Sequence, residues 1–223
     1  MVRNAALEGL RTRIGACAWD RAVTLVAASK SQPASAIREL AAAGQRVFGE
    51  NYVQEALGKQ RELAELDLEW HMIGPLQSNK CAEVARHFDW LQSLDREKLV
   101  PLLDRARRPE LPPLNVLIEV NVSGESSKSG CAPGQLSTLA DKIMRARRLR
   151  LRGLMAIPAP EPDPSQRRAA FARLRGMFDG LRRDHPLADT LSMGMSDDFE
   201  LAIAEGATMV RVGTALFGPR KRE

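Results

Sequence analysis

Val23-Thr-Leu-Val-Ala-Ala-Ser-Lys30 is a short apolar run, rich in β-branched residues, that ends at a lysine. Such a run is typical of a buried parallel strand, and Ser31-Gln-Pro33 after it predicts a helix that begins at the proline. Lys30 is therefore expected at the carboxyl end of the strand, where α/β folds place functional groups. A desolvated lysine amine is neutral there and can form a Schiff base with an aldehyde. On this stretch alone, a lysine that points into water stays an open alternative.

The same pattern of strand and helix repeats along the whole chain. Strands are expected over residues 23–29, 46–50, 69–73, 89–93, 114–122, 151–157, 190–195 and 207–212. Amphipathic segments between them predict helices, with Asp95 and Asp197 as caps of those after the fourth and seventh strands. A proline-rich loop is expected over 158–164, because proline interrupts both helix and central strand.

Eight alternations of strand and helix, without a shift in composition, predict an α/β fold: one (β/α)8 TIM-barrel domain over residues 1–223. An open doubly wound sheet is the alternative. Only eleven residues follow Val212, which is too few for a full eighth helix. An extra N-terminal helix, expected over 3–18, could fill that position in the ring, and this detail favours the barrel.

The chain has 223 residues and a formal net charge of +5. Most of the positive excess is arginine on predicted helices, which is typical of a solvated helix face. Nucleic-acid binding is the weaker alternative, because no aromatic residues interleave these arginines to stack on bases. We therefore expect no specific nucleic-acid partner.

Three cysteines, Cys17, Cys81 and Cys131, are widely spaced and form neither a CxxC pair nor a zinc-binding pattern. An odd number of isolated cysteines favours a reducing compartment. The first twenty residues carry several charges and lack a signal-peptide core. No apolar run approaches the roughly 20 residues that span a bilayer. We expect a cytoplasmic protein without a metal site.

In a TIM barrel, the loops after strands seven and eight commonly bind phosphate. Here they read Ser192-Met-Gly-Met-Ser-Asp-Asp198 and Arg211-Val-Gly-Thr214, which offer hydroxyls, open backbone and an arginine. With Lys30 on the same rim, they suit a phosphorylated aldehyde, either pyridoxal phosphate or an aldolase substrate. An ordinary turn at Gly213-Thr214 is the plainer alternative.

Four further features have both a functional and a plain interpretation. Asn51 follows the second strand and could bind a ligand or only turn the chain. His71 is more typical of a satisfied core residue than of an acid or base. Asp197-Asp198 could hold a metal but is more typical of a helix cap. The methionines at 155, 193 and 195 are most simply explained as part of the packing of the barrel.

Seven segments, in this order, resemble the YggS/PROSC family of pyridoxal phosphate homeostasis proteins over nearly the whole chain. They are Leu25-Val-Ala-Ala-Ser-Lys30, Phe48-Gly-Glu-Asn-Tyr-Val-Gln-Glu55, Trp70-His-Met-Ile-Gly-Pro-Leu-Gln-Ser-Asn-Lys80, Ser127-Lys-Ser-Gly130, Leu151-Arg-Gly-Leu-Met-Ala-Ile-Pro158, Leu191-Ser-Met-Gly-Met-Ser-Asp-Asp198 and Met209-Val-Arg-Val-Gly-Thr-Ala-Leu-Phe-Gly218. Two details depart from the familiar pattern. The segment 17–23 is shorter, and Ser31-Gln-Pro33 replaces Thr-Lys-Pro.

The resemblance implies a barrel like the N-terminal domain of alanine racemase, with pyridoxal 5′-phosphate held as an aldimine on a lysine. By position that lysine is Lys30. The resemblance places the phosphate at Ser192 and at Gly213 and Thr214. It places Arg211 by the pyridine nitrogen or the phosphate, and Asn51 at the ligand-facing rim.

The resemblance also implies a protein that buffers or delivers the cofactor, with apoenzymes as partners and without robust catalysis. The absence of a second domain favours a monomer. Racemases of this fold add a second domain and a partner subunit that supply a catalytic tyrosine. The single tyrosine here, Tyr52, opens a predicted helix, so proton transfer on both faces of a substrate would lack its second group. A racemase, a decarboxylase or a Schiff-base aldolase is the alternative.

Overall fold

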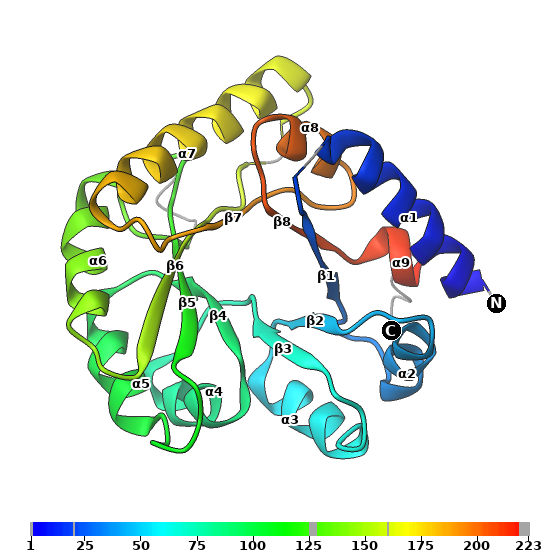
Figure 1. Ribbon diagram of the computed structural model, residues 1–223, viewed down its shortest axis with the longest axis horizontal. Helices are drawn as coiled ribbons and strands as arrows, with labels where there is room; N and C mark the ends of the chain where they lie inside the picture. The colour runs from blue at the N-terminus through cyan, green and yellow to red at the C-terminus, as the bar shows by residue number, and fades with distance from the viewer. Residues whose placement is uncertain (1, 20, 125–128, 160, 219–223) are drawn as a thin grey trace.

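The computed structural model describes residues 2–19, 21–124, 129–159 and 161–218. Within them, eight parallel strands close into a barrel in chain order (Figure 1). The strands are β1 Thr24–Ala28, β2 Val47–Glu50, β3 Glu69–Met72, β4 Trp90–Leu94, β5 Leu114–Glu119, β6 Leu149–Met155, β7 Thr190–Ser192 and β8 Met209–Val212. β1 pairs with both β2 and β8. The predicted (β/α)8 barrel is confirmed, and the open sheet is excluded.

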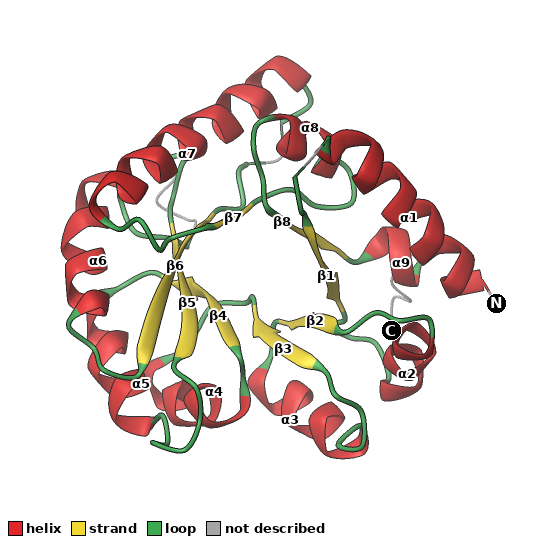
Figure 2. Cartoon of the chain, in the orientation of Figure 1, coloured by secondary structure: helices red, strands yellow, loops and turns green. Residues whose placement is uncertain are grey.

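Helices surround the barrel in an outer ring (Figure 2). They are α1 Val2–Ala18, α2 Ala34–Ala42, α3 Val53–Glu62, α4 Cys81–His87, α5 Val100–Ala106, α6 Leu136–Met144, α7 Pro164–Asp184, α8 Phe199–Ala204 and α9 Thr214–Phe217, with 3₁₀ turns η1 Ser78–Lys80, η2 Glu97–Leu99 and η3 Pro133–Gln135. In the part of the chain that the structure describes, no helix combines the length and the apolar character that a bilayer crossing requires.

The N-terminal helix α1 completes this ring. It packs against α8, α9 and α2, beside the seam between β8 and β1 (Figure 1). Leu7, Leu10 and Ile14 recur at helical spacing and are buried in that contact. Burial of each such side chain contributes about 1.5–3 kcal/mol. This burial stabilises the contact of α1 with the barrel beside the seam between β8 and β1. The expected role of the segment 3–18 is confirmed.

Several predicted boundaries differ from the structure, and local hydrogen bonding explains the differences. β5 ends at Glu119, and Val120 forms only an isolated bridge to Cys131. β7 ends at Ser192, because Gly194 turns the chain with φ +94, a conformation that suits glycine. Pro164, expected in the loop, is the first residue of α7, where its missing N–H costs no hydrogen bond.

The two predicted aspartate caps are wrong. α8 begins at Phe199, so Asp198 and not Asp197 holds its N-cap position. The Asp198 carboxylate accepts the Met195 N–H at 2.7 Å and forms no cap hydrogen bond to the helix. Asp95 lies before η2, and its carboxylate accepts from Arg96 at 2.9 Å. At neither helix start does the predicted aspartate hold the N-cap position.

The barrel interior holds a small apolar cluster separate from the main core, made of Val26, Trp90, Leu117, Met155 and Met209. The main core lies between the strands and the outer helices. Full burial of the methionines at 155 and 193 confirms their predicted packing, but the one at 195 is 41% exposed and that prediction is wrong. Buried polar side chains also occupy the barrel: His71, Gln92, Ser192 and Arg211.

Candidate functional site

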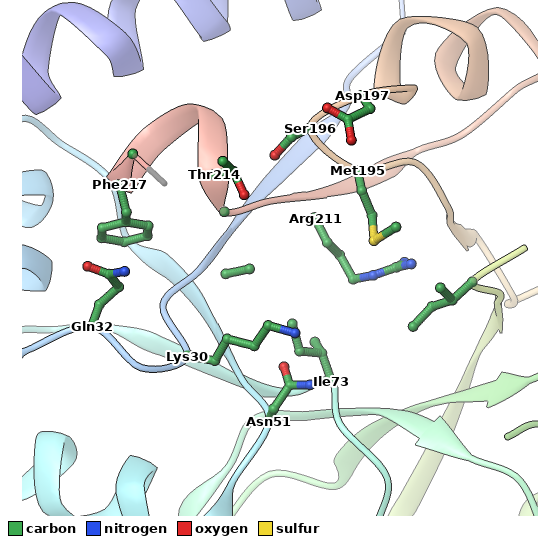
Figure 3. Close-up of a pocket in the computed structure, with 14 residues that line it drawn as sticks. Lys30, Gln32, Asn51, Ile73, Met195, Ser196, Asp197, Arg211, Thr214 and Phe217 are labelled. Atoms are coloured by element: carbon green, nitrogen blue, oxygen red, sulfur yellow. The ribbon is translucent and has the colours of Figure 1, made fainter. Parts of the chain in front are cut away.

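A cavity of about 270 Å³ opens at the carboxyl ends of the strands, where β1, β2 and β8 lie next to one another. Five of the six residues predicted from the sequence line it: Lys30, Asn51, Arg211, Gly213 and Thr214 (Figure 3). They come from three separate parts of the chain, and barrel closure brings them together. We call this cavity the rim pocket.

Lys30 follows β1 directly and enters the rim pocket from its β1 side. Figure 3 shows its amine directed toward Asn51 and the guanidinium of Arg211. Ser31, the next residue, has φ +60, a left-handed conformation that costs a residue with a Cβ about 1–2 kcal/mol. The surrounding structure must therefore hold this turn in place.

A buried lysine on α3 holds that turn. Lys59 Nζ donates to the Ser29 carbonyl at 2.8 Å, to Glu50 Oε1 at 2.7 Å and to Glu55 Oε1 at 2.5 Å. Ser29 Oγ donates to Glu50 Oε1 at 2.6 Å, and the Ser31 N–H donates to Glu55 Oε1 at 2.7 Å. Both neighbours of Lys30 are thereby fixed. We call these five residues the Lys59 clamp.

The clamp was missed from the sequence, although a signal was present. Lys59 falls at the same three-residue spacing as Val53 and Ala56, which form the buried face of α3. A lysine on the apolar face of a helix needs a buried partner. Glu50, at the end of the preceding strand, is such a partner and is fully buried.

Asn51 presents an unsatisfied polar atom in the wall of the rim pocket. Among the described residues its buried Oδ1 has no hydrogen-bond partner. Gly74 packs so closely against Asn51 that a Cβ at this glycine would lie 2.5 Å from the Asn51 carbonyl oxygen. Because buried polar atoms are rarely left unpaired, the amide is suited to a ligand in the pocket.

Arg211 reaches the pocket from inside β8 and is only 4% exposed. Its Nη1 donates to Ser192 Oγ at 2.6 Å and its Nη2 donates to the Ala156 carbonyl at 3.0 Å. Burial lowers the pKa of Arg211 to about 10, so the guanidinium stays charged at neutral pH. The pocket therefore contains a fixed positive charge close to Lys30.

Ser192 is the one predicted residue that the structure does not bring to the pocket surface. It is fully buried, and its hydroxyl donates to Gln92 while accepting from Arg211. Ser196, four residues later in the same loop, lines the wall together with Thr214. Asp197 shares that wall (Figure 3), and no group of three metal-ligating side chains occurs within the described residues.

The remaining candidates lie away from the pocket surface. His71 is fully buried, and its two ring nitrogens meet Gln92 and Glu69 at 2.7 Å, so the predicted core role is confirmed. Tyr52 precedes α3 and is 62% exposed. Lys80 forms an ion pair with Glu83 at 3.6 Å. Ser127 and Lys128, from the predicted Ser-Lys-Ser-Gly segment, lie outside the described residues.

Glu119, at the end of β5, is a buried carboxyl in the electrostatic field of Arg211. Burial, and then the Asp95 carboxylate, raises the pKa of Glu119 from 4.5 to about 7, while Arg211 opposes the rise. The folded protein therefore keeps a proton on this carboxyl between pH 4.5 and 7, where the unfolded chain has released it. Glu119 consequently stabilises the fold at low pH, and this contribution is lost as the pH rises to about 7.

We expect the variant Glu119→Gln to remove this pH dependence, because the amide is neutral at every pH. Between pH 5 and pH 8 its unfolding free energy should rise by about 2–3 kcal/mol relative to that of the parent. Urea denaturation of both apoproteins at the two pH values measures the difference. A constant difference between the two proteins would show that Glu119 is ionised throughout.

Comparisons with known proteins identify similar chains. The model of the alanine racemase N-terminal domain family matches residues 12–221. A pyridoxal phosphate homeostasis protein of Pseudomonas aeruginosa is 56% identical over 223 residues, covering 99% of this chain and 96% of the relative. One of Escherichia coli K12 is 55% identical over 201 residues, covering 89% of this chain and 86% of the relative. The structure of PipY of Synechococcus elongatus with PLP bound has a TM-score of 0.87 and 40% identity, over 97% of this chain and all of that one (100%).

Proposed function

Because this chain belongs to the alanine racemase N-terminal domain family and, within it, to the pyridoxal phosphate homeostasis proteins, we propose that it holds pyridoxal 5′-phosphate and buffers or delivers it to apoenzymes. Residues 1–223 act in this proposal as one cofactor-binding domain, a monomer in the cytoplasm. One observation carries the proposal. Lys30, the unpaired amide oxygen of Asn51 and the buried Arg211 charge share one pocket at the mouth of the barrel.

The chemistry of the rim pocket fits this cofactor. Pyridoxal phosphate supplies an aldehyde that a lysine amine captures as a Schiff base, and Lys30 is the lysine among the described lining residues. Thr214 and the backbone at Gly213 would bind the phosphate. The side-chain amide of Asn51 would form a hydrogen bond with the ligand. Arg211 would contact the phosphate or the pyridine nitrogen, with Ser192 supporting it from below.

The groups around Lys30 support a binding role over catalysis. If Arg211 faces the pyridine nitrogen, its positive charge disfavours protonation of the ring, and an unprotonated ring withdraws electrons more weakly. The phenol of Tyr52 is exposed and does not line the pocket, so it is not placed as the second acid or base. Tyr52 thus does not supply the second proton-transfer group that racemisation would need.

The covalent site is tested by borohydride reduction of the purified protein with its cofactor, followed by peptide mapping. We expect the pyridoxyl mass on Lys30, and the Lys30→Ala variant should lose both this label and the visible absorption band. Lys80→Ala is the matched control, because Lys80 does not line the rim pocket, and it should behave like the parent. A label on another lysine, or no label, would overturn the assignment.

A racemase or decarboxylase is the second candidate, and one observation favours it. Asp197 places a carboxylate on the wall of the rim pocket across from Lys30 (Figure 3). A panel of amino acids, with chirality and carbon dioxide release followed over time, separates the two functions. Turnover above about 1 s⁻¹, the low end of ordinary enzymes, would replace the binding role by an enzymatic one.

A further inference from the structure

A chain of hydrogen bonds crosses the inside of the barrel, from the rim pocket to the opposite end. Arg211 Nη1 lies 2.6 Å from Ser192 Oγ, and Ser192 Oγ lies 2.6 Å from Gln92 Oε1. Gln92 Nε2 lies 2.7 Å from His71 Nδ1, and His71 Nε2 lies 2.7 Å from Glu69 Oε1. Glu69 is the first residue of β3, so this polar chain ends where the strands begin.

The orientation of the Gln92 amide sets the direction of the polar chain. Its Nε2 lies near two acceptors, His71 Nδ1 and the Met209 sulfur at 3.1 Å, so its Oε1 must face Ser192. The Ser192 hydroxyl then donates to Gln92 and turns a lone pair toward Arg211. Every hydrogen bond from Arg211 to Glu69 consequently runs in the same sense.

The far end of the polar chain keeps this direction fixed. Burial lowers the pKa of His71, which favours the neutral ring, although Glu69 and Asp89 oppose that shift. With Nδ1 accepting from Gln92, the single N–H of the neutral ring lies on Nε2 and donates to Glu69. Trp90 stacks on His71 at 5.1 Å between ring centroids and holds the plane of the ring.

Gln92 is fully buried, and within the described residues its side chain forms hydrogen bonds with Ser192, His71 and the Met209 sulfur. Met209 belongs to the apolar cluster of the barrel interior. In such an environment a satisfied polar network is rigid, and an unsatisfied one is costly. Arg211, which has many rotamers, gains from Ser192 and Ala156 a single orientation toward the rim pocket.

We infer that Gln92 is the positioning residue for Arg211: it orients the Ser192 hydroxyl, and through it the guanidinium that faces the ligand. Gln92 does not line the rim pocket and acts only through these two residues. The inference rests on the proposed function in one respect, since it takes Arg211 as a ligand contact. Gln92 would then influence the affinity for the ligand although it does not line the rim pocket.

A double-mutant cycle tests this coupling through the affinity of apoprotein for pyridoxal phosphate, measured by calorimetry. Gln92→Met, which keeps the volume but removes both polar atoms, should weaken binding about tenfold, the effect of one lost hydrogen bond to a charged group. Arg211→Gln should weaken binding by at least as much. The double variant should match Arg211→Gln alone, and additive losses would overturn the inference.

Two further variants separate positioning from a loss of stability. Gln92→Glu keeps an acceptor for Ser192 and should bind within about threefold of the parent, because Arg211 keeps its support. Leu139→Ala leaves a cavity in the outer core on α6, away from the polar chain, and should lower the melting temperature of the protein. It should leave the affinity unchanged, and a loss equal to that of Gln92→Met would overturn the positioning role.

A measurement without cofactor keeps the inference separate from the proposed function. In apoprotein, the side-chain N–H signals of Arg211 report its orientation in nitrogen-15 spectra. They should shift and exchange faster with water in Gln92→Met, but not in Leu139→Ala. If the parent fails to bind pyridoxal phosphate, the proposed function fails while this result stands. Unchanged Arg211 signals in Gln92→Met would overturn the inference alone.

Discussion

Lys59→Met is expected to lower the unfolding free energy by about 3–5 kcal/mol, because it leaves a buried carboxylate without its partner. Lys59 meets Glu50 and Glu55 at 2.7 and 2.5 Å, and its own side chain is only 7% exposed. Burial already raises the pKa of Glu50, and Lys59 is the charge that opposes that rise. Urea denaturation at pH 7.5 measures the loss.

The same variant should weaken the ligand site, since Lys59 also holds the Ser29 carbonyl. Adding Glu50→Gln to Lys59→Met should recover part of the stability, because no charge is then left buried. Lys142→Met is the matched control. Its partner is Glu97 at 3.2 Å on the surface, and such a pair contributes at most about 1 kcal/mol. A loss below 1 kcal/mol in Lys59→Met would show that the clamp contributes no more than a surface pair.

Gly74→Ala is expected to cost about 3 kcal/mol and to loosen the ligand, because the new methyl group has no space. Its Cβ would lie 2.5 Å from the carbonyl oxygen and 2.7 Å from the Cα of Asn51, both of them backbone atoms. The segment that carries Asn51 must therefore move away from its place in the rim pocket. Thermal unfolding and calorimetric titration with pyridoxal phosphate follow the two effects.

Gly58→Ala provides the contrast for this prediction. Gly58 lies within α3, and a Cβ there would meet nothing within 4 Å. Alanine is favoured over glycine inside a helix by about 0.5–1 kcal/mol, so this variant should be slightly more stable than the parent and bind equally well. If both variants behave alike, the close approach of Gly74 to Asn51 is not a constraint on the site.

The fold was predictable because its signals are local. Each strand is a short apolar run between turn residues, and α1 repeats Leu7, Leu10 and Ile14 at helical spacing. Strand ends were less predictable, because the end of β7 depends on Gly194 and that of β5 on a bridge to Cys131. Such endings depend on tertiary partners that a local pattern does not contain.

The site was predictable up to the direction in which each side chain points. Lys30 and Asn51 follow apolar runs, so their place at the rim follows from counting residues. Ser192 was expected in the pocket wall, but it is the last residue of β7, and its buried hydroxyl donates to Gln92 instead. Lys59 escaped notice because an isolated lysine on a helix is normally solvated.

The seam between β1 and β8 has a consequence for how the protein is made. Lys30 and Arg211 lie near opposite ends of the sequence and become neighbours only when Val26 pairs with Arg211. Contacts between such distant residues are the slowest to form, because the intervening chain must first be ordered. During synthesis, Lys30 is thus translated long before Arg211. A nascent chain on the ribosome carries Lys30 without the rim pocket, because the pocket exists only in the closed barrel.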